Sequence, residues 1–370
     1  MLRPLTSFRF LAALLVFLFH TGGIFVVYGL GSAGVQFFFV LSGFILAYTY
    51  QTKLNVLNKE NIRRFYLARF AKIYPVHLLT FLLATPLVLI YFDPEGLYAI
   101  KLAIMSGINL FLVQSYIPIS SVYFNFNSVS WTLSVEAFFY LIFPFLLYGL
   151  KRFNIFKNTK VILSLLTLVW AGLFILNLIL TQENKIFVWA LNIFPATRAF
   201  EFMVGVVLGL IFIKRSDQSK PGKELSSNLK ELGCLILIST FIMLSGVLEL
   251  PNMRGLFFVP AWGLLIYTFA FQKGVFSRIL SNKYLVYLGE ISFSFYMIHA
   301  LALSYVDYMH FSLWLSHTLS FIIALVLSSI IFKYYEEPLR KKIRFGFGNA
   351  ATQNEGKLQN IHPDRNAEAI

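Results

Sequence analysis

Long runs of apolar residues, separated by short polar loops, recur along almost the whole chain. A helix needs about 20 residues at 1.5 Å per residue to cross the hydrocarbon core of a bilayer. Segments long enough to do so cover residues 5–28, 32–51, 73–92, 130–150, 161–180, 196–213, 231–249, 256–272, 285–306 and 313–335. The pattern predicts an all-α integral membrane protein with about ten transmembrane helices.

An eleventh segment, 99–116, has a shorter apolar reach and contains Lys101, Asn109 and Gln114. If it does not cross, most Lys and Arg residues fall in loops on one side of the membrane. Such a bias marks the cytoplasmic side. If it crossed, most of these residues would face outward. The sequence therefore predicts a re-entrant or interfacial helix at 99–116, with both termini in the cytoplasm.

The composition agrees with a membrane domain. The 370 residues are 58% hydrophobic and 13% charged, whereas soluble domains have about 25% charged residues. Residues 1–345 are expected to form one transmembrane domain, and the polar stretch 346–370 a disordered cytoplasmic tail. The net charge of +14 is explained by membrane orientation, so no nucleic-acid partner is expected. The single Cys234 excludes an internal disulfide, and no two histidines have metal-ligand spacing, so no metal is expected.

The first span carries two polar side chains on one face. Arg9 and His20 are eleven residues apart, which at 100° per residue is about 20° past three full turns. A charged and a titratable side chain inside a membrane are unfavourable and by default indicate a function. The alternative is an interfacial anchor at Arg9 and a packing role for His20.

The fourth span carries a second polar stripe. Thr132, Glu136 and Tyr140 recur every four residues, so they share a helix face. A carboxylate there needs a partner. Glu136 and His20 are both expected in the outer half of the membrane, and contact between them is a hypothesis.

A dense basic segment precedes the third span, which is expected to begin near Pro75. Orientation alone accounts for Arg63 and Arg64. It accounts less well for Arg69 and Lys72, which are three residues apart on one side of a helix. A cytoplasmic cationic cluster of this kind can bind the phosphates of a nucleotide-bearing donor.

Small residues in the second and sixth spans allow close helix packing. Ser42 and Gly43 form one such site, and Gly205 and Gly209 another. A second interpretation of Ser42–Gly43 is a break that turns backbone N–H groups toward a ligand.

Two later spans carry polar residues for which packing is the simpler interpretation. Arg198 and Glu201 are three residues apart and can neutralise each other. Ser292, Tyr296 and His299 align on one face of the ninth span, where His299 is interpreted as a hydrogen-bonded packing residue.

Five motifs occur in an order that resembles the membrane acyltransferase family 3. They are Arg9 followed by ten residues and His20, then FFFVLSGF, KIYP, SWTLSVE and FYMIHA. The resemblance covers roughly residues 5 to 345. It implies that Arg9, His20 and Glu136 are the residues associated with activity. The family usually carries an Arg-x-x-Arg pair where this chain has Arg69 and Lys72, which keeps the charge but loses one guanidinium fork.

The resemblance implies acyl transfer, in particular O-acetylation. The donor would be cytoplasmic acetyl-CoA or another acyl-CoA. The acceptor would be a hydroxyl of a carbohydrate or lipid-linked glycan at the outer face of a bacterial inner membrane. The expected donor-binding residues are Arg69, Lys72, Arg64 and Ser42.

An imidazole with an ordinary pKa near 6.5 can act as general base on a hydroxyl. His20 is therefore expected to be the base, assisted by Glu136, and a transiently acylated His20 is a variant of this mechanism. The competing function is a proton-coupled transporter or flippase of a lipid-linked saccharide, in which Arg9, His20 and Glu136 form a proton relay.

Overall fold

The computed structural model describes residues 2–54, 56–91, 95–153, 158–180, 184–216, 224–248 and 254–344. Within these ranges the chain forms helices and turns and no strand. The prediction of an all-α membrane protein is confirmed. The polar tail expected at 346–370 lies outside the described residues.

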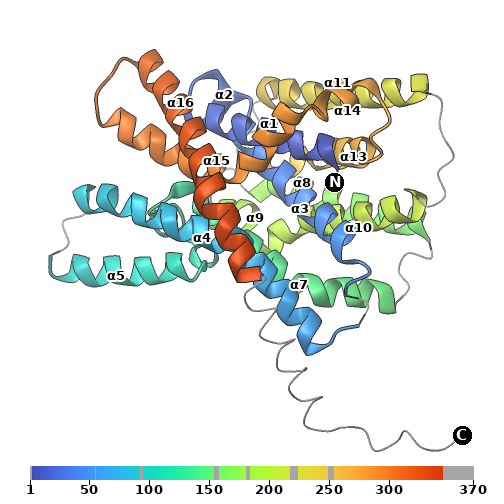
Figure 1. Cartoon of the computed structure of the whole chain (residues 1–370), viewed down its shortest axis with the longest axis horizontal. Coiled ribbons are helices and arrows are strands. Elements are labelled where there is room, and N and C mark those ends of the chain that lie inside the picture. Colours follow the sequence, from blue (N-terminus) through green and yellow to red (C-terminus); the bar gives the residue numbers. More distant parts are fainter. Residues whose placement is uncertain are drawn as a thin grey trace, which may run out of the picture.

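Nine of the described helices are long and apolar enough to cross a membrane. Four of them form a central group, in which α1 packs against α3 and α15, and α3 packs against α10 (Figure 1). The nine are α1 (Arg3–His20), α3 (Leu30–Tyr50), α4 (Lys59–Tyr91), α7 (Trp131–Arg152), α8 (Thr159–Leu180), α10 (Pro195–Ser216), α11 (Glu224–Val247), α15 (Lys283–Asp307) and α16 (Leu313–Ile331).

Shorter helices and turns connect these elements. The α-helices are α2 (Ile24–Val27), α5 (Leu97–Leu110), α6 (Ser120–Tyr123), α9 (Lys185–Asn192), α12 (Arg254–Phe257), α13 (Val259–Ala270) and α14 (Val275–Leu280). Two 3₁₀ turns, η1 (Gln114–Tyr116) and η2 (Ser128–Ser130), precede α7, and a π-helical turn, η4 (Phe332–Glu336), follows α16.

The segment expected to cross at 256–272 is divided between α12 and α13, which are too short to span a bilayer singly. After α13, the chain nevertheless returns to the same end of the bundle as the first turns of α11. Glu231, near the start of α11, accepts hydrogen bonds from the backbone of Gly274 (2.8 Å) and from the hydroxyl of Ser277 (2.5 Å). The short helices therefore complete a crossing inside the protein, where neighbouring helices cover them.

Two predicted helix limits are wrong: the end of the first span and the start of the third. The first was predicted to run to residue 28, but α1 stops at His20, since Gly22 and Gly23 adopt positive φ of 83° and 62°. The third was predicted to begin near Pro75, but α4 begins at Lys59. Pro75 is buried mid-helix, and packing against neighbouring helices compensates for its missing N–H.

The segment predicted as re-entrant or interfacial contains α5. Figure 1 shows α4 and α5 projecting together from one end of the bundle. His77 of α4 hydrogen-bonds the backbone oxygen of Asn109 near the end of α5 (3.0 Å). With 14 residues, α5 is about 21 Å long, which is too short for a full span.

Glycines bring α3 and α10 into direct backbone contact, as the sequence predicts for a small-residue packing face. A Cβ at Gly43 would overlap the carbonyl oxygen of Phe202, and one at Gly205 would overlap that of Val40. The predicted ion pair between Arg198 and Glu201 forms beside this contact, buried, at 2.9 Å. The polar residues of α10 are therefore structural.

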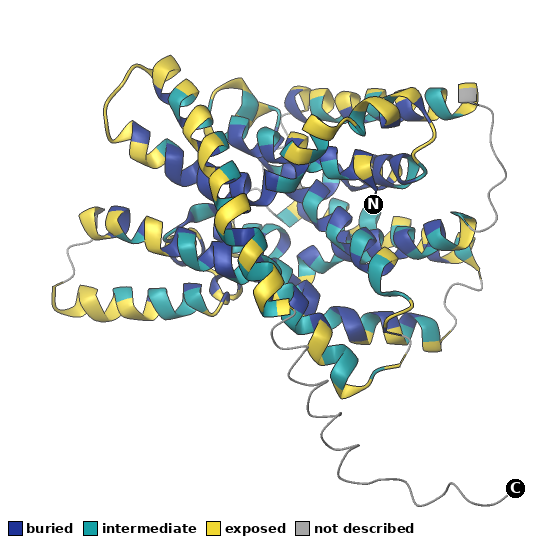
Figure 2. Ribbon diagram, viewed as in Figure 1, coloured by how far each residue is buried: buried dark blue, intermediate teal, exposed yellow. Residues whose placement is uncertain are grey.

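Many residues of the outer helices are exposed (Figure 2), and a large share of them are apolar. On α8, Leu165, Leu168 and Ile179 are each more than half exposed, an arrangement that lipid stabilises and water does not. The interior of the bundle is the reverse, with buried aromatic rings such as Phe37, Phe139 and Phe295.

Candidate active site

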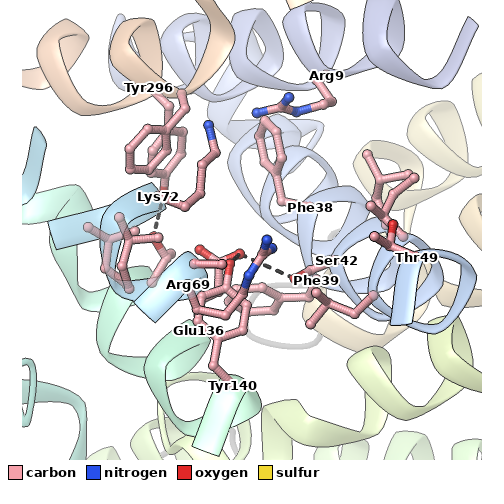
Figure 3. Close-up of a pocket in the computed structure, with 18 of the residues that line it drawn as sticks. Arg9, Phe38, Phe39, Ser42, Thr49, Arg69, Lys72, Glu136, Tyr140 and Tyr296 are labelled. Atoms are coloured by element: carbon pink, nitrogen blue, oxygen red, sulfur yellow. Dashed lines mark hydrogen bonds between the residues drawn. The ribbon is translucent and has the colours of Figure 1, made fainter. Parts of the chain in front are cut away.

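A cavity of about 490 Å³ lies between α1, α3, α4, α7, α15 and the helical extension that follows η4. Figure 3 shows the polar side chains that point into it. Both ends of the described chain border it, through Leu2 and Arg344. The predicted site residues that line it are Arg9, Ser42, Arg69, Lys72 and Glu136.

The cavity is strongly cationic. Arg9 of α1 and Lys72 of α4 point into the same space (Figure 3). Arg69 enters from one turn earlier on α4, and Arg340 and Arg344 come from the extension of α16. Positive charges that converge from three helices in a space of low dielectric attract a polyanion strongly.

One of these cations is already paired. Lys72 Nζ lies 2.7 Å from Oε1 of Glu336, and Ser294 donates a hydrogen bond to Oε2 of the same carboxylate (2.7 Å). Glu336 is the last residue of the π-helical turn. Such turns shift the register of a helix and are frequent at functional sites. The turn therefore directs an acidic side chain inward at Lys72.

Glu136 faces the cavity from α7 and is held by two hydroxyl groups. Ser42 donates to its Oε1 (3.2 Å) and Tyr140, one turn away on the same helix, donates to the same atom (2.5 Å). Arg69 lies over the rings of Tyr50 and Tyr140, with its guanidinium 5.4 and 5.7 Å from their centroids. The carboxylate is thus fixed among the cations of the cavity.

The cavity ends at a layer of aromatic and hydroxyl groups. Tyr296 of α15 and Thr132 of α7 hydrogen-bond through their hydroxyls (3.1 Å). The ring of Phe38 packs edge-on against Tyr296, with centroids 5.7 Å apart. All three side chains line the cavity, whereas His20 does not.

His20 lies beyond this layer, paired with His299. Nε2 of His299 is 3.2 Å from Nδ1 of His20, and Nδ1 of His20 is also 2.8 Å from the carbonyl oxygen of Val16. On a straight helix His20 is about 16 Å from Arg9. His299, one turn from Tyr296 on α15, is buried and hydrogen-bonded, as the sequence interpretation expects, and its contact with His20 is one that the sequence analysis did not predict.

The structure contradicts the hypothesis that His20 and Glu136 touch. Glu136 bonds to Ser42 and Tyr140, whereas His20 bonds to Val16 and His299. His20 and Glu136 were expected at a similar depth, but His299 of α15 lies nearer to His20 and is its partner. Glu136 therefore belongs with the cavity and not with the imidazole.

Arg64 lies outside the cavity lining. Its side chain is exposed and pairs with Glu60 one turn earlier on α4, at 2.5 Å. Arg63 is also exposed, 3.9 Å from the same carboxylate. Of the four residues predicted to bind the donor, Arg64 is thus the one that the structure does not bring to the cavity, because its side chain points to the surface and pairs with Glu60.

The sequence analysis did not identify the contribution of the last helix. Glu336, Arg340 and Arg344 are spaced four residues apart, and this spacing places them on one helical face. The sequence analysis singled out none of the three. Among the residues that the structure describes, no group of three or more His, Cys, Asp or Glu side chains is placed to hold a metal.

The fold and the cavity define a polytopic helical membrane protein with a cationic cavity between its helices. The family described as "Acyltransferase domain" matches residues 5–334. The chain therefore belongs to this acyltransferase family, and the predicted resemblance is confirmed.

Relatives support the same class. The chain is 30% identical to the acyltransferase MdmB of Streptomyces mycarofaciens, over 82% of this chain and 79% of that protein. It is 26% identical to the peptidoglycan O-acetyltransferase OatA of Listeria monocytogenes, over 84% and 51%, and 24% identical to the O-acetyltransferase OatA of Staphylococcus aureus, over 84% and 53%. The chain thus spans about half the length of the OatA proteins. No solved structure matches it.

Proposed function

We propose that the chain transfers an acyl group, in its simplest form acetyl, from acyl-CoA on the cytoplasmic side to a hydroxyl of a carbohydrate or lipid-linked glycan at the outer face of a bacterial inner membrane. Membership of the acyltransferase family supports the reaction class. The names of the OatA relatives support O-acetylation of a glycan. Both termini are cytoplasmic in this proposal, in agreement with the cavity that Leu2 and Arg344 share.

The donor would occupy the cavity with its phosphates at the end near Arg344. Arg69 and Arg9 offer guanidinium groups, which suit bidentate phosphate contacts, and Lys72 offers a point charge. Arg340 adds a further cation to the lining. The exposed Arg64 would act only by attracting the anionic donor toward the entrance.

Glu136 would keep these cations in place. Its charge and that of Glu336 interact with the guanidinium of Arg9. The hydrogen bond from Ser42 fixes the carboxylate at the cavity wall. Ser42 would therefore support the donor site through Glu136.

His20 would act as general base at the outer end. Its Nε2 takes the proton of the acceptor hydroxyl while the hydroxyl oxygen attacks the thioester carbonyl carbon. The new C–O bond forms, the C–S bond breaks, and the proton passes to the departing CoA thiolate. Because His20 is the last residue of α1, the negative end of the helix dipole stabilises the transient imidazolium.

The thioester has to pass the layer of Thr132, Tyr296 and Phe38 to reach His20. The hydroxyl pair closes this layer, together with the ring contacts of Tyr296 to Phe38 and His299 and the hydrogen bond from Thr132 to the carbonyl of Val129. Rotation of the Tyr296 and Phe38 side chains would open it. We infer that the layer opens when donor and acceptor are both bound, which would keep water from hydrolysing the thioester.

The observation that carries the proposal is the match to the acyltransferase family across a chain whose cavity gathers Arg9, Arg69 and Lys72. It is tested by mass spectrometry of surface glycans in cells that make the protein naturally. Acyl esters should be present with the wild-type chain and absent with His20→Asn at equal membrane abundance. Unchanged esters in the variant would contradict the base role, and a glycan without esters in wild-type cells would favour the transporter.

A further inference from the structure

We propose that His299 is a positioning residue for His20, in that it accepts the Nδ1–H of His20 and so holds the imidazole in the one tautomer that can act as base. The inference rests on the proposed function, which gives His20 that role. It assigns to a buried histidine of α15 the part that a carboxylate takes in a Ser-His-Asp triad.

The directions of the hydrogen bonds follow from their acceptors. Nδ1 of His299 is 2.6 Å from the carbonyl oxygen of Tyr296, which can only accept. This nitrogen therefore carries the proton, and Nε2 of a neutral His299 has a free lone pair. Nδ1 of His20 faces the carbonyl of Val16 at 2.8 Å, so it also carries its proton. The bond of 3.2 Å between the two rings then runs from His20 to His299.

The consequence for His20 is a bare Nε2. A neutral imidazole has one protonated nitrogen, and the protein fixes the proton on Nδ1 through two acceptors, the Val16 carbonyl and the His299 ring. Among the described residues, both hydrogen bonds of the His20 ring involve Nδ1, and none involves Nε2. It is therefore the nitrogen available to take a proton from an acceptor hydroxyl.

His299 is held so that it cannot turn over. Its side chain is 0% exposed. The ring of Phe295 stacks on it with centroids 6.2 Å apart, and Phe17 packs edge-on at 6.3 Å. Rotation of the ring would break the bond to Tyr296 in an apolar site, where an unpaired N–H is unfavourable.

A neutral acceptor is also suited to the charged state. When Nε2 of His20 takes a proton, its Nδ1–H bonds to Val16 and His299 become charge-assisted and strengthen. The histidine pair thus stabilises the imidazolium without a carboxylate in contact with it.

Two variants of similar size separate this role from packing. In His299→Gln the amide oxygen can reach the position of Nε2 and accept from His20. In His299→Asn the amide can still donate to the Tyr296 carbonyl, but the shorter side chain cannot reach His20. His317→Asn, on α16 outside the cavity lining, is the control for loss of a histidine.

The rate of transfer is measured by a pulse of isotopically labelled acetate in the native cells, as the rate at which label enters surface acyl esters at equal membrane abundance. His299→Asn should slow labelling on the order of 10- to 100-fold, as expected for loss of a partner that orients a ligand or base. His299→Gln should recover most of the rate, and His317→Asn should match the wild type. A wild-type rate in His299→Asn, or equal losses in the Gln and Asn variants, would overturn the proposal.

A second measurement does not depend on the activity of any variant. Nitrogen-15 NMR of the purified wild-type protein, labelled at its six histidines, reports which nitrogen of His20 carries the proton. The His20 signals are assigned as those that His20→Asn lacks. We expect Nδ1 protonated and Nε2 bare, and the opposite tautomer would overturn the proposal.

The proposed function and this inference fail in different ways. If His20→Asn labels glycans at the wild-type rate, the base role itself is wrong. If His20→Asn abolishes labelling while His299→Asn is unaffected, only the positioning role is wrong.

Discussion

Individual side chains of the cavity have distinguishable roles because their partners differ. Lys72 is bonded to Glu336 at 2.7 Å. Within the described ranges, Arg69 donates one hydrogen bond, to the hydroxyl of Tyr50 at 3.3 Å, and its buried Nε has no hydrogen-bond partner. Of the two cavity cations on α4, Arg69 therefore has more N–H groups available to a phosphate than Lys72 has.

Replacing Arg69 should therefore weaken donor binding. A hydrogen bond to a charged group contributes about 1.5–3 kcal/mol, so Arg69→Gln should raise the dissociation constant for coenzyme A about 10- to 100-fold in isothermal titration of the purified protein. Arg63→Gln removes an exposed charge from the same helix and is the matched control. Equal affinities of the Arg69 variant and the wild type would remove Arg69 from the donor site.

At this scale the sequence predicts which residues line the cavity better than it predicts their contacts. Helical spacing shows that Glu136 and Tyr140 share a face, and they hydrogen-bond. It contains no information on which helix lies opposite. The pairing of His20 with His299 joins residues 279 positions apart, so the sequence analysis assigned His20 the wrong partner.

Among the helices, α3 lines the cavity with one face and packs against α10 with another. Ser42 lines the cavity on one side of α3, while the next residue, Gly43, contacts the backbone of Phe202 on α10. The packing interpretation of Gly43 is confirmed. The second interpretation, a break at Ser42–Gly43, is wrong, because α3 continues as a helix through both residues.

A methyl group at Gly43 should separate these helices. Gly43→Ala would place Cβ against the carbonyl of Phe202, and overpacking of this kind is destabilising by typically about 1–3 kcal/mol. We expect a lower melting temperature in detergent and reduced glycan acylation. Gly172→Ala on α8, where an added Cβ meets no atom within 4 Å, should leave both unchanged. A Gly43 variant as stable as the Gly172 variant would contradict the packing described.

Hydropathy predicted most of the long helices but not their ends or interruptions. It placed the start of the third span near Pro75, where the apolar run follows the basic segment, yet α4 begins at Lys59. It also treated 256–272 as one span, although α12 and α13 are separate. Helix limits of this kind depend on packing inside the bundle. Hydropathy adds up apolar residues along the chain and carries no information on packing.

For the whole molecule, two sites lie at different levels of one bundle. The cationic cavity contains Arg9, and the histidine pair contains His20, about 16 Å farther along α1. The layer of Thr132 and Tyr296 separates them. This arrangement suits a reaction whose donor and acceptor approach from opposite sides of the membrane.

The most direct test is a transfer assay with the donor confined to one side. Right-side-out membrane vesicles from the native cells are loaded with labelled acetyl-CoA, which does not cross lipid, or receive it only outside. We predict that label enters outer-face glycan esters, cleavable by an esterase added outside, only when the donor is enclosed. Labelling by external donor, or esters that form only on the enclosed side, would contradict transfer through the protein.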